Sequence, residues 1–342
     1  MLSGLLALSS LAACDIPTSA PIIDVRWLVP AQTSRISVST LLPGGVSILA
    51  DSSGFTVNAA SATVTRALSA DCAPCAAGNG FTGPKPAFIA IASTSTSVPP
   101  DISSASLTSG SLVINVANNY TFDPLRPNGT SAPFGNATIT VSNGSTSLGS
   151  TVINGSTTAL NPNGTLSITV PLAGPISGAS PITIAFTVNS PAGGVVQMDA
   201  SRTIVVTVIP TALKVANANV SVAGRTLSSS LNMNLDVDSA ITNRVIDGKM
   251  QLTIVNPFAV TSTATVKLQP DNGAVINKIV SLGLNTTTAT IPLTLAEVRS
   301  LFGHNVTITI AGAANATGPV SVSPRQTVVV TTRFDLTLEV GS

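Results

Sequence analysis

The sequence contains little charge, few aromatic side chains and a single histidine. Charged residues make up 8% and aromatic residues 3% of the 342 residues, and the formal net charge is +1, whereas ordinary domains carry about 25% charged residues. The charges are scattered singly, without a basic run, an aromatic and arginine platform or an acidic tail. This composition argues against nucleic acid as a partner, and the shortage of His and Glu argues against an enzyme.

Long hydrophobic runs are also missing. Leu2–Ala13 is apolar, but a dozen or so residues fall short of the roughly 20 that a membrane-spanning helix needs. That length is typical of the hydrophobic region of a signal peptide, although the usual basic segment is lacking, since the first basic residue is Arg26.

The apolar run ends in Leu11-Ala12-Ala13-Cys14, which resembles the bacterial lipobox. The resemblance implies that residues 1–13 are a signal peptide, that Cys14 becomes the lipidated first residue of the mature chain, and that 14–21 is a tether. Because several acyl chains anchor a protein durably, we expect attachment to a membrane of a bacterial cell envelope through Cys14.

What the chain has in quantity is β-branched residues, with 44% hydrophobic residues, 26 Gly and 23 Pro. This composition predicts an all-β protein. Runs of alternating apolar and polar residues about every 8–12 positions, separated by Asn-Gly turns, are typical of antiparallel β-sandwiches. Short strands at 25–29, 35–38 and 55–58 predict a small β-rich N-terminal region over 22–101.

The remainder of the chain contains an internal repeat. Gly110–Tyr120 recurs as Gly248–Phe258, with an offset of 256 − 118 = 138 residues. Thr169–Leu172 recurs as Thr290–Leu293. The strand after Arg202 recurs as the strand after Arg325, with an offset of 325 − 202 = 123 residues. The repeat predicts two related Ig-like sandwiches, 102–215 and 216–342.

The strand ending in Val255-Asn256-Pro257-Phe258 resembles a strand of late embryogenesis abundant type 2 domains. The resemblance covers about one strand per repeat, and the first copy has Asn119-Tyr120 in place of Pro-Phe. It implies a small Ig-like sandwich that serves as a non-catalytic structural or interaction module.

Besides Cys14 the sequence has two cysteines, which form the motif Cys72-Ala73-Pro74-Cys75. Such a pair can form a local disulfide, act in redox chemistry or supply half a zinc site. A redox motif needs a strand–helix–strand context, and zinc needs further ligands, which a single histidine does not provide. In an oxidising envelope the disulfide is favoured.

Leu231–Asp238 alternates apolar residues with Asn232, Asn234, Asp236 and Asp238. Carboxylate and amide oxygens suit a hard cation, so Asp236 and Asp238 are candidate metal ligands. The alternative is a solvated edge strand whose polar face blocks unwanted strand pairing. The spacing of a calcium loop is missing.

The single histidine, His304, follows a segment that predicts a short helix. Thr294 and Glu297 form a capping-box pattern, and Gly303 lies where a helix ends. No G-x-S-x-G motif accompanies His304, so we interpret it as a surface residue at the end of the helix.

These patterns together predict a non-enzymatic envelope lipoprotein that acts as a structural, adhesive or protein-interaction module. No cofactor is predicted, and the expected partners are the membrane, through Cys14, and another envelope protein. A carbohydrate- or calcium-binding module is the alternative, and an envelope hydrolase is the third candidate. Sugar-binding proteins usually present aromatic rings, and this chain has one Trp and one Tyr.

Overall fold

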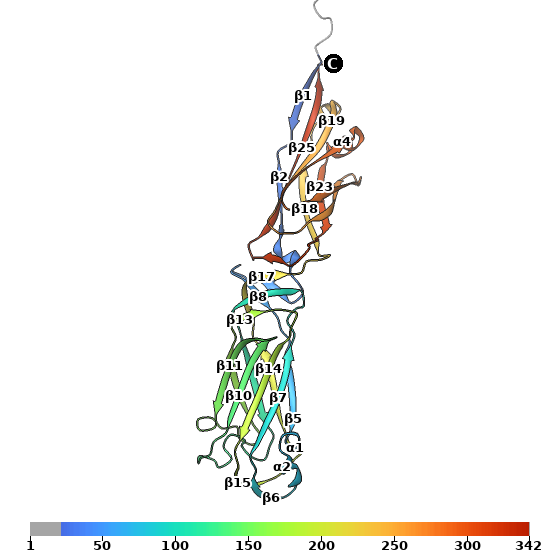
Figure 1. Cartoon of the computed structure of the whole chain (residues 1–342). Helices are drawn as coiled ribbons and strands as arrows, with labels where there is room; N and C mark the ends of the chain where they lie inside the picture. Colours follow the sequence, from blue (N-terminus) through green and yellow to red (C-terminus); the bar gives the residue numbers. More distant parts are fainter. Residues whose placement is uncertain (1–21, 342) are drawn as a thin grey trace, which may run out of the picture.

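The computed structural model describes residues 22–341 and confirms an all-β protein, with about 58% strand and 8% helix. The molecule is elongated (Figure 1). One sandwich lies at each end, and a smaller sheet crosses between them. The strands of the first sandwich, the lower one in Figure 1, run along the long axis of the molecule, whereas β8(Ile102–Ser109) and β17(Leu213–Val220) of the middle sheet run across it.

The first sandwich consists of two four-stranded sheets. One sheet has the order β11(Thr146–Asn154), β10(Asn136–Asn143), β14(Ile182–Ser190), β7(Phe88–Thr96). The other has the order β12(Gly164–Pro171), β9(Ser111–Asn118), β16(Thr203–Pro210), β5(Ala62–Ala67). Their strands alternate buried and accessible residues, as Leu112, Ile114 and Val116 of β9 illustrate. Every second side chain therefore enters the core between the two sheets.

The second sandwich repeats this arrangement and takes in the first described strands of the chain. One sheet has the order β1(Ile23–Leu28), β25(Thr327–Val340), β19(Val245–Asn256), β22(Asn285–Leu293), and β2(Gln32–Ser37) also pairs with β25. The other has the order β18(Thr226–Asn234), β23(Asn305–Ala313), β20(Ser262–Pro270), β21(Ile276–Leu282). The long strand β25 accepts both β1 and β2 along one edge.

The middle sheet and a small ribbon complete the strands. The middle sheet has the order β13(Gly174–Ile176), β8(Ile102–Ser109), β17(Leu213–Val220), β4(Phe55–Val57), β3(Val46–Ile48), with β24(Val320–Val322) also on β17. The ribbon pairs β15(Gly193–Gln197) with β6(Thr82–Lys85).

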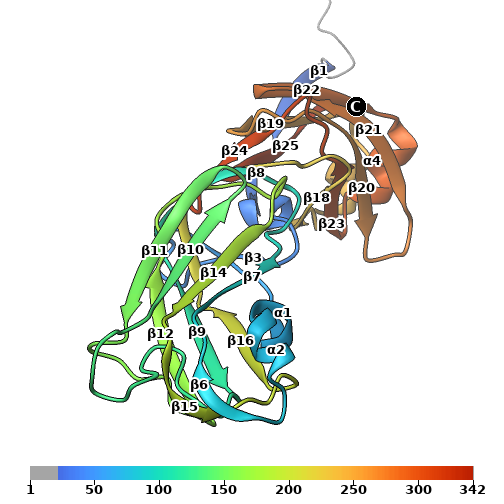
Figure 2. The ribbon, with the colours of Figure 1, turned by 60° about the horizontal axis from the view of Figure 1, so that its bottom comes forward.

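The helical elements are short. They are η1(Val38–Leu41), α1(Leu68–Asp71), α2(Ala73–Ala77), α3(Ser239–Thr242) and α4(Leu295–Leu301). Figure 2 shows α1 and α2 on a flank of the first sandwich and α4 on the second. The predicted capping box is present, because the Thr294 hydroxyl accepts from the Glu297 N–H and the Glu297 carboxylate accepts from the Thr294 N–H.

The structure distributes the strands of 22–101 among the two sandwiches, the middle sheet and the β6–β15 ribbon, all of which also contain later parts of the chain. β1 and β2 belong to the second sandwich, β3 and β4 to the middle sheet, and β5 and β7 to the first sandwich. This range is therefore not a separate region, contrary to the prediction. The predicted boundary at 215/216 falls inside β17, where Val215 and Ala218 are both buried. Long-range strand pairing, which local patterns do not encode, explains both differences.

The strand register relates the two sandwiches residue by residue. Val113 pairs with Thr169, and its counterpart Gln251 pairs with Thr290, so the second of the three matched segments is aligned as predicted. For the third segment the offset is wrong by one. Ala117 pairs with Val205 and Val255 pairs with Val329, which gives 329 − 205 = 124 instead of 123.

Candidate functional site

The end of the first sandwich farthest from β1 carries two exposed apolar side chains on the β6–β15 ribbon. Phe81, directly before β6, is 72% exposed, and Val195 on β15 is 69% exposed. In the register of the ribbon Val195 pairs with Pro84. We call Phe81, Val195 and the ribbon the distal tip. Exposed aromatic and aliphatic residues at the end of a rod are suited to contact a partner.

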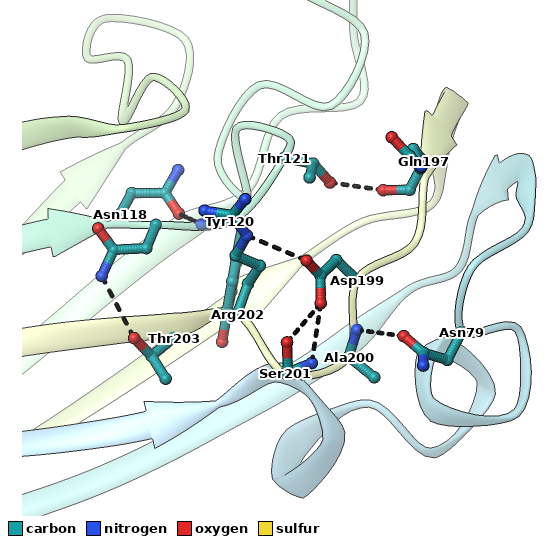
Figure 3. A network of polar contacts seen from close by, with 11 residues as sticks. Asn79, Asn118, Tyr120, Thr121, Gln197, Asp199, Ala200, Ser201, Arg202 and Thr203 are labelled. Atoms are coloured by element: carbon teal, nitrogen blue, oxygen red, sulfur yellow. Dashed lines mark hydrogen bonds and ion pairs between the residues drawn. The ribbon is translucent and has the colours of Figure 1, made fainter.

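A network of hydrogen bonds ties the distal tip to the sandwich (Figure 3). The Met198 N–H donates to the Phe81 carbonyl at 2.9 Å. The Ala200 N–H donates to the Asn79 side chain at 2.9 Å, and the Thr121 hydroxyl donates to the Gln197 carbonyl at 2.5 Å. These bonds connect the two sides of the ribbon and the loop after β9. The distal tip is therefore fixed to the first sandwich by hydrogen bonds as well as by the chain itself.

Asp199 organises the turn that leads from the ribbon into β16. Its Oδ1 accepts from the hydroxyl of Ser201 at 2.6 Å, and its Oδ2 accepts from Nε of Arg202 at 3.0 Å. These hydrogen bonds hold the pKa of Asp199 below its usual range, and the bond from the Ser201 hydroxyl has the largest effect. The carboxylate and the Arg202 guanidinium neutralise each other, so the turn adds no net charge to the distal tip.

Lys85 at the end of β6 is almost wholly buried, with 1% of its surface exposed. Its Nζ donates to the carbonyls of Pro86 and Pro191 and lies 4.9 Å from the ring centroid of Phe88 and 5.5 Å from that of Phe122. Burial lowers the pKa of Lys85 to about 8. The lysine thus fixes the ribbon to the sandwich through carbonyl dipoles and ring faces. The sequence pattern gave no sign of its burial.

The predicted cysteine pair lies next to the distal tip. Cys72, which lies between α1 and α2, forms a disulfide with Cys75 of α2, and both residues are buried. Beside it Arg66 donates to the carboxylate of Asp71 at 2.5 Å. The disulfide is confirmed, and its burial among core residues gives it a structural place.

The predicted cation ligands are not brought together. Asp236 follows edge strand β18 and offers an exposed side chain, while Asp238 caps α3 by accepting from the Ala240 N–H at 2.7 Å. Within residues 22–341, no group of three or more His, Cys, Asp or Glu side chains is placed to hold a metal ion. The polar face of β18 fits the edge-strand interpretation, because β18 lies at the border of its sheet.

His304 has a partner that the sequence pattern did not reveal. Its Nδ1 lies 2.7 Å from Oδ1 of Asp271, and its Nε2 lies 3.1 Å from the amide of Asn272. The backbone N–H of Asn305 and the imidazole hold the pKa of Asp271 below its usual range. Asp271 lines a shallow surface groove together with Asn232 and Thr307. A histidine with both ring nitrogens engaged by Asp271 and Asn272 is suited to fix the turn after β20.

Cys14, the predicted lipidation site, lies outside the described residues. In the part of the chain from residue 22 to residue 341, no helix has both the length and the apolar character needed to cross a membrane.

No family model matches the chain, and no curated protein matches it. Among solved structures, it is similar to a candidate secreted protein of Parabacteroides distasonis, with 8% identity, a TM-score of 0.37, and coverage of 91% of this chain and 99% of that one. It is also similar to the cowpea mosaic virus top component, with 8% identity, a TM-score of 0.18, and coverage of 98% and 95%. Scores this low carry no functional argument.

Proposed function

We propose that this protein is a non-enzymatic lipoprotein of a bacterial cell envelope that holds its first sandwich and distal tip away from the membrane. The observation that carries the proposal is the placement of the two ends. β1, which begins at Ile23 only nine positions after Cys14 (23 − 14 = 9), lies at one end of the elongated molecule, and the β6–β15 ribbon lies at the other (Figure 1).

The first strands are attached firmly enough to carry such an anchor. All six residues of β1 pair with β25, and Arg26 donates two hydrogen bonds of 2.7 and 2.6 Å to the carboxylate of Asp335. A lipid chain on Cys14 would therefore pull on a strand that is hydrogen-bonded along its length. A flexible tail leading to a separate N-terminal region would not transmit the anchor to the body in this way.

The distal tip supports an adhesive or protein-interaction role. Phe81 and Val195 are exposed, and the network around Asp199 keeps their ribbon ordered. Preorganised aromatic and aliphatic side chains contact a partner with little loss of conformational entropy. We infer that the partner is another envelope protein with an apolar recess.

Two measurements test the proposal. Radiolabelled palmitate should enter the wild-type chain and should not enter Cys14→Ser, which should also leave the membrane fraction. A photo-crosslinking residue at position 81 should capture one discrete partner in intact cells. The same residue at position 279, which is equally exposed at 76% but lies on the second sandwich, serves as the control. Absence of label from the wild-type chain would refute lipid anchoring through Cys14. Equal capture at both positions would refute partner binding by the distal tip.

A further inference from the structure

The outer face of the β11–β10–β14–β7 sheet carries no charged side chain. Residues 127–198 include β10, β11 and β14 and contain no Asp, Glu, Lys, Arg or His, and β7 contains none either. The outward positions are Thr, Ser, Asn, Ala and a few large aliphatic residues. We call this surface the neutral face. A surface of this size without charge has no electrostatic barrier against meeting an identical surface.

The neutral face is specific to the first sandwich. In the second sandwich the strand equivalent to β10 is β20, because each pairs with the following strand (β11 or β21) on one side and with a later strand (β14 or β23) on the other. There Lys267 points outward between the buried residues Val266 and Leu268. The low charge of the whole chain therefore does not by itself account for the neutral face.

One row of side chains across the neutral face is self-complementary. The register aligns Val152, Thr138, Thr187 and Ile91 across the four strands, from one edge of the sheet to the other. The two edge residues are the most exposed of the row, Val152 at 63% and Ile91 at 62%. The apolar side chains thus lie at the two ends of the row, with threonines between them.

We propose that the neutral face pairs with the neutral face of a second copy of this chain, about a two-fold axis parallel to the strands. Such an axis exchanges left and right across the sheet but keeps the height along it. Ile91 of one copy then meets Val152 of the other, twice per dimer, and Thr138 meets Thr187. This is the self-matching that an isologous interface requires, and sheets that pack face to face align in this way.

The area is sufficient for a dimer of modest affinity. With strands about 4.8 Å apart and about 3.4 Å per residue, four strands of eight residues offer roughly 500 Å² per copy. Two copies would bury roughly 1,000 Å² in total, the lower bound for a specific interface. Because the axis runs along the molecule, both copies point the same way, so two chains anchored at the same end can pair side by side in one membrane.

Charge substitutions on the purified full-length chain test the pairing by sedimentation velocity at concentrations up to a few hundred micromolar. We expect the wild type to dimerise and Ile91→Lys or Val152→Glu to weaken the dimer by about tenfold or more. The double variant should recover dimerisation, because each lysine then meets a glutamate of the other copy. Within one chain the two positions lie three strand spacings apart, roughly 14 Å, so the recovery requires two chains.

Ile209→Lys is the matched control, because Ile209 is an exposed isoleucine on β16 of the opposite sheet. It should leave the dimer intact. A monomeric wild type would overturn the proposal, as would a failure of the double variant to recover while circular dichroism shows that it is folded. Loss of the dimer in Ile209→Lys would assign the contact to the other sheet. Binding of a neutral glycan by a strictly monomeric chain would point to a different occupant. None of these results depends on acylation of Cys14.

Discussion

Asn118 and Asn256 occupy the same position in the two sandwiches and make the same hydrogen bonds. Each is buried at the end of a central strand, and each accepts from the backbone N–H two residues later, at 2.9 Å from Tyr120 and 3.1 Å from Phe258. Each also donates its amide to the carbonyl four residues later, that of Phe122 or Val260. A second carbonyl, that of Leu160 or Gly283, comes from a different loop.

Removing either amide should therefore destabilise its own sandwich. We expect Asn118→Ala or Asn256→Ala to lower the free energy of unfolding by about 3 kcal/mol, because buried carbonyl and N–H groups lose their partners. Urea unfolding measures the loss. Asn277→Ala, at an exposed position of β21, is the control and should change stability by less than about 0.5 kcal/mol. Equal effects at the three positions would show that the buried amides are not structural anchors.

The Cys72–Cys75 disulfide should be present in the exported protein, where mass spectrometry should find both thiols oxidised. Because the bridge closes a loop with a sequence separation of only 3, replacing both cysteines by alanine should cost only about 1–2 kcal/mol. Hydrogen exchange should rise in α1 and α2 and remain unchanged in α4. Free thiols in the exported chain would contradict the prediction.

Burial of Lys85 should make stability depend on pH. The unfolded side chain has a pKa near 10.5, and burial lowers the folded value to about 8. The unfolded chain therefore binds more protons between these values, so the Lys85 contribution to the free energy of unfolding should rise as pH increases through this window. The full rise is on the order of 3 kcal/mol at about 1.4 kcal/mol per pKa unit.

Lys85→Met should lack this rise, and the exposed Lys214→Met should retain it. Urea unfolding between about pH 8 and pH 9 keeps the measurement below the range, near pH 10, in which the single tyrosine of the unfolded chain ionises. Parallel pH profiles of the wild type and Lys85→Met would rule out a buried lysine with a lowered pKa.

The Arg26–Asp335 ion pair should make stability rise with pH in the same direction, but in the acid range. The hydrogen bonds from Arg26 keep the pKa of Asp335 below its usual range, so their stabilisation is present above the unfolded pKa of about 3.9 and is lost as pH falls through the lower folded value. Arg26→Met should lower the urea midpoint at neutral pH and have little effect in strong acid. Arg35→Met on β2, at an exposed position, is the comparison. A loss of the same size at both pH values would mean that Arg26 acts through packing alone.

Much of the fold follows from local patterns. Alternation predicted the strands that became β1, β2 and β4, and the capping box of Thr294 and Glu297 predicted α4. The one-residue error in the third repeat segment has a physical cause: Thr327–Thr332 is β-branched at every position, so its sequence does not reveal which face is buried.

The placement of strands and the candidate site could not be predicted in the same way. β1 pairs with a strand at the far end of the sequence, and β24 has only three residues. Neither leaves a local signal. The same holds for Lys85, which sequence alone would place in solvent, and for the Asp271–His304 contact, which depends on the turn after β20. The alternating Asn and Asp residues from Asn232 to Asp238 predicted one strand, but the edge strand β18 ends at Asn234, and Asp236 and Asp238 follow it.

The pairing of β1 and β2 with β25 constrains the order in which the chain can fold as it leaves the ribosome. The first sandwich is complete once residue 210 has emerged, because all its strands lie between residues 62 and 210. β1 and β2 must wait for residues 327–340, a separation of 309 positions for Arg26 and Asp335. β1 and β2 therefore stay without this partner until the last strand has been made, and a chain truncated before β25 would leave both segments open to proteolysis.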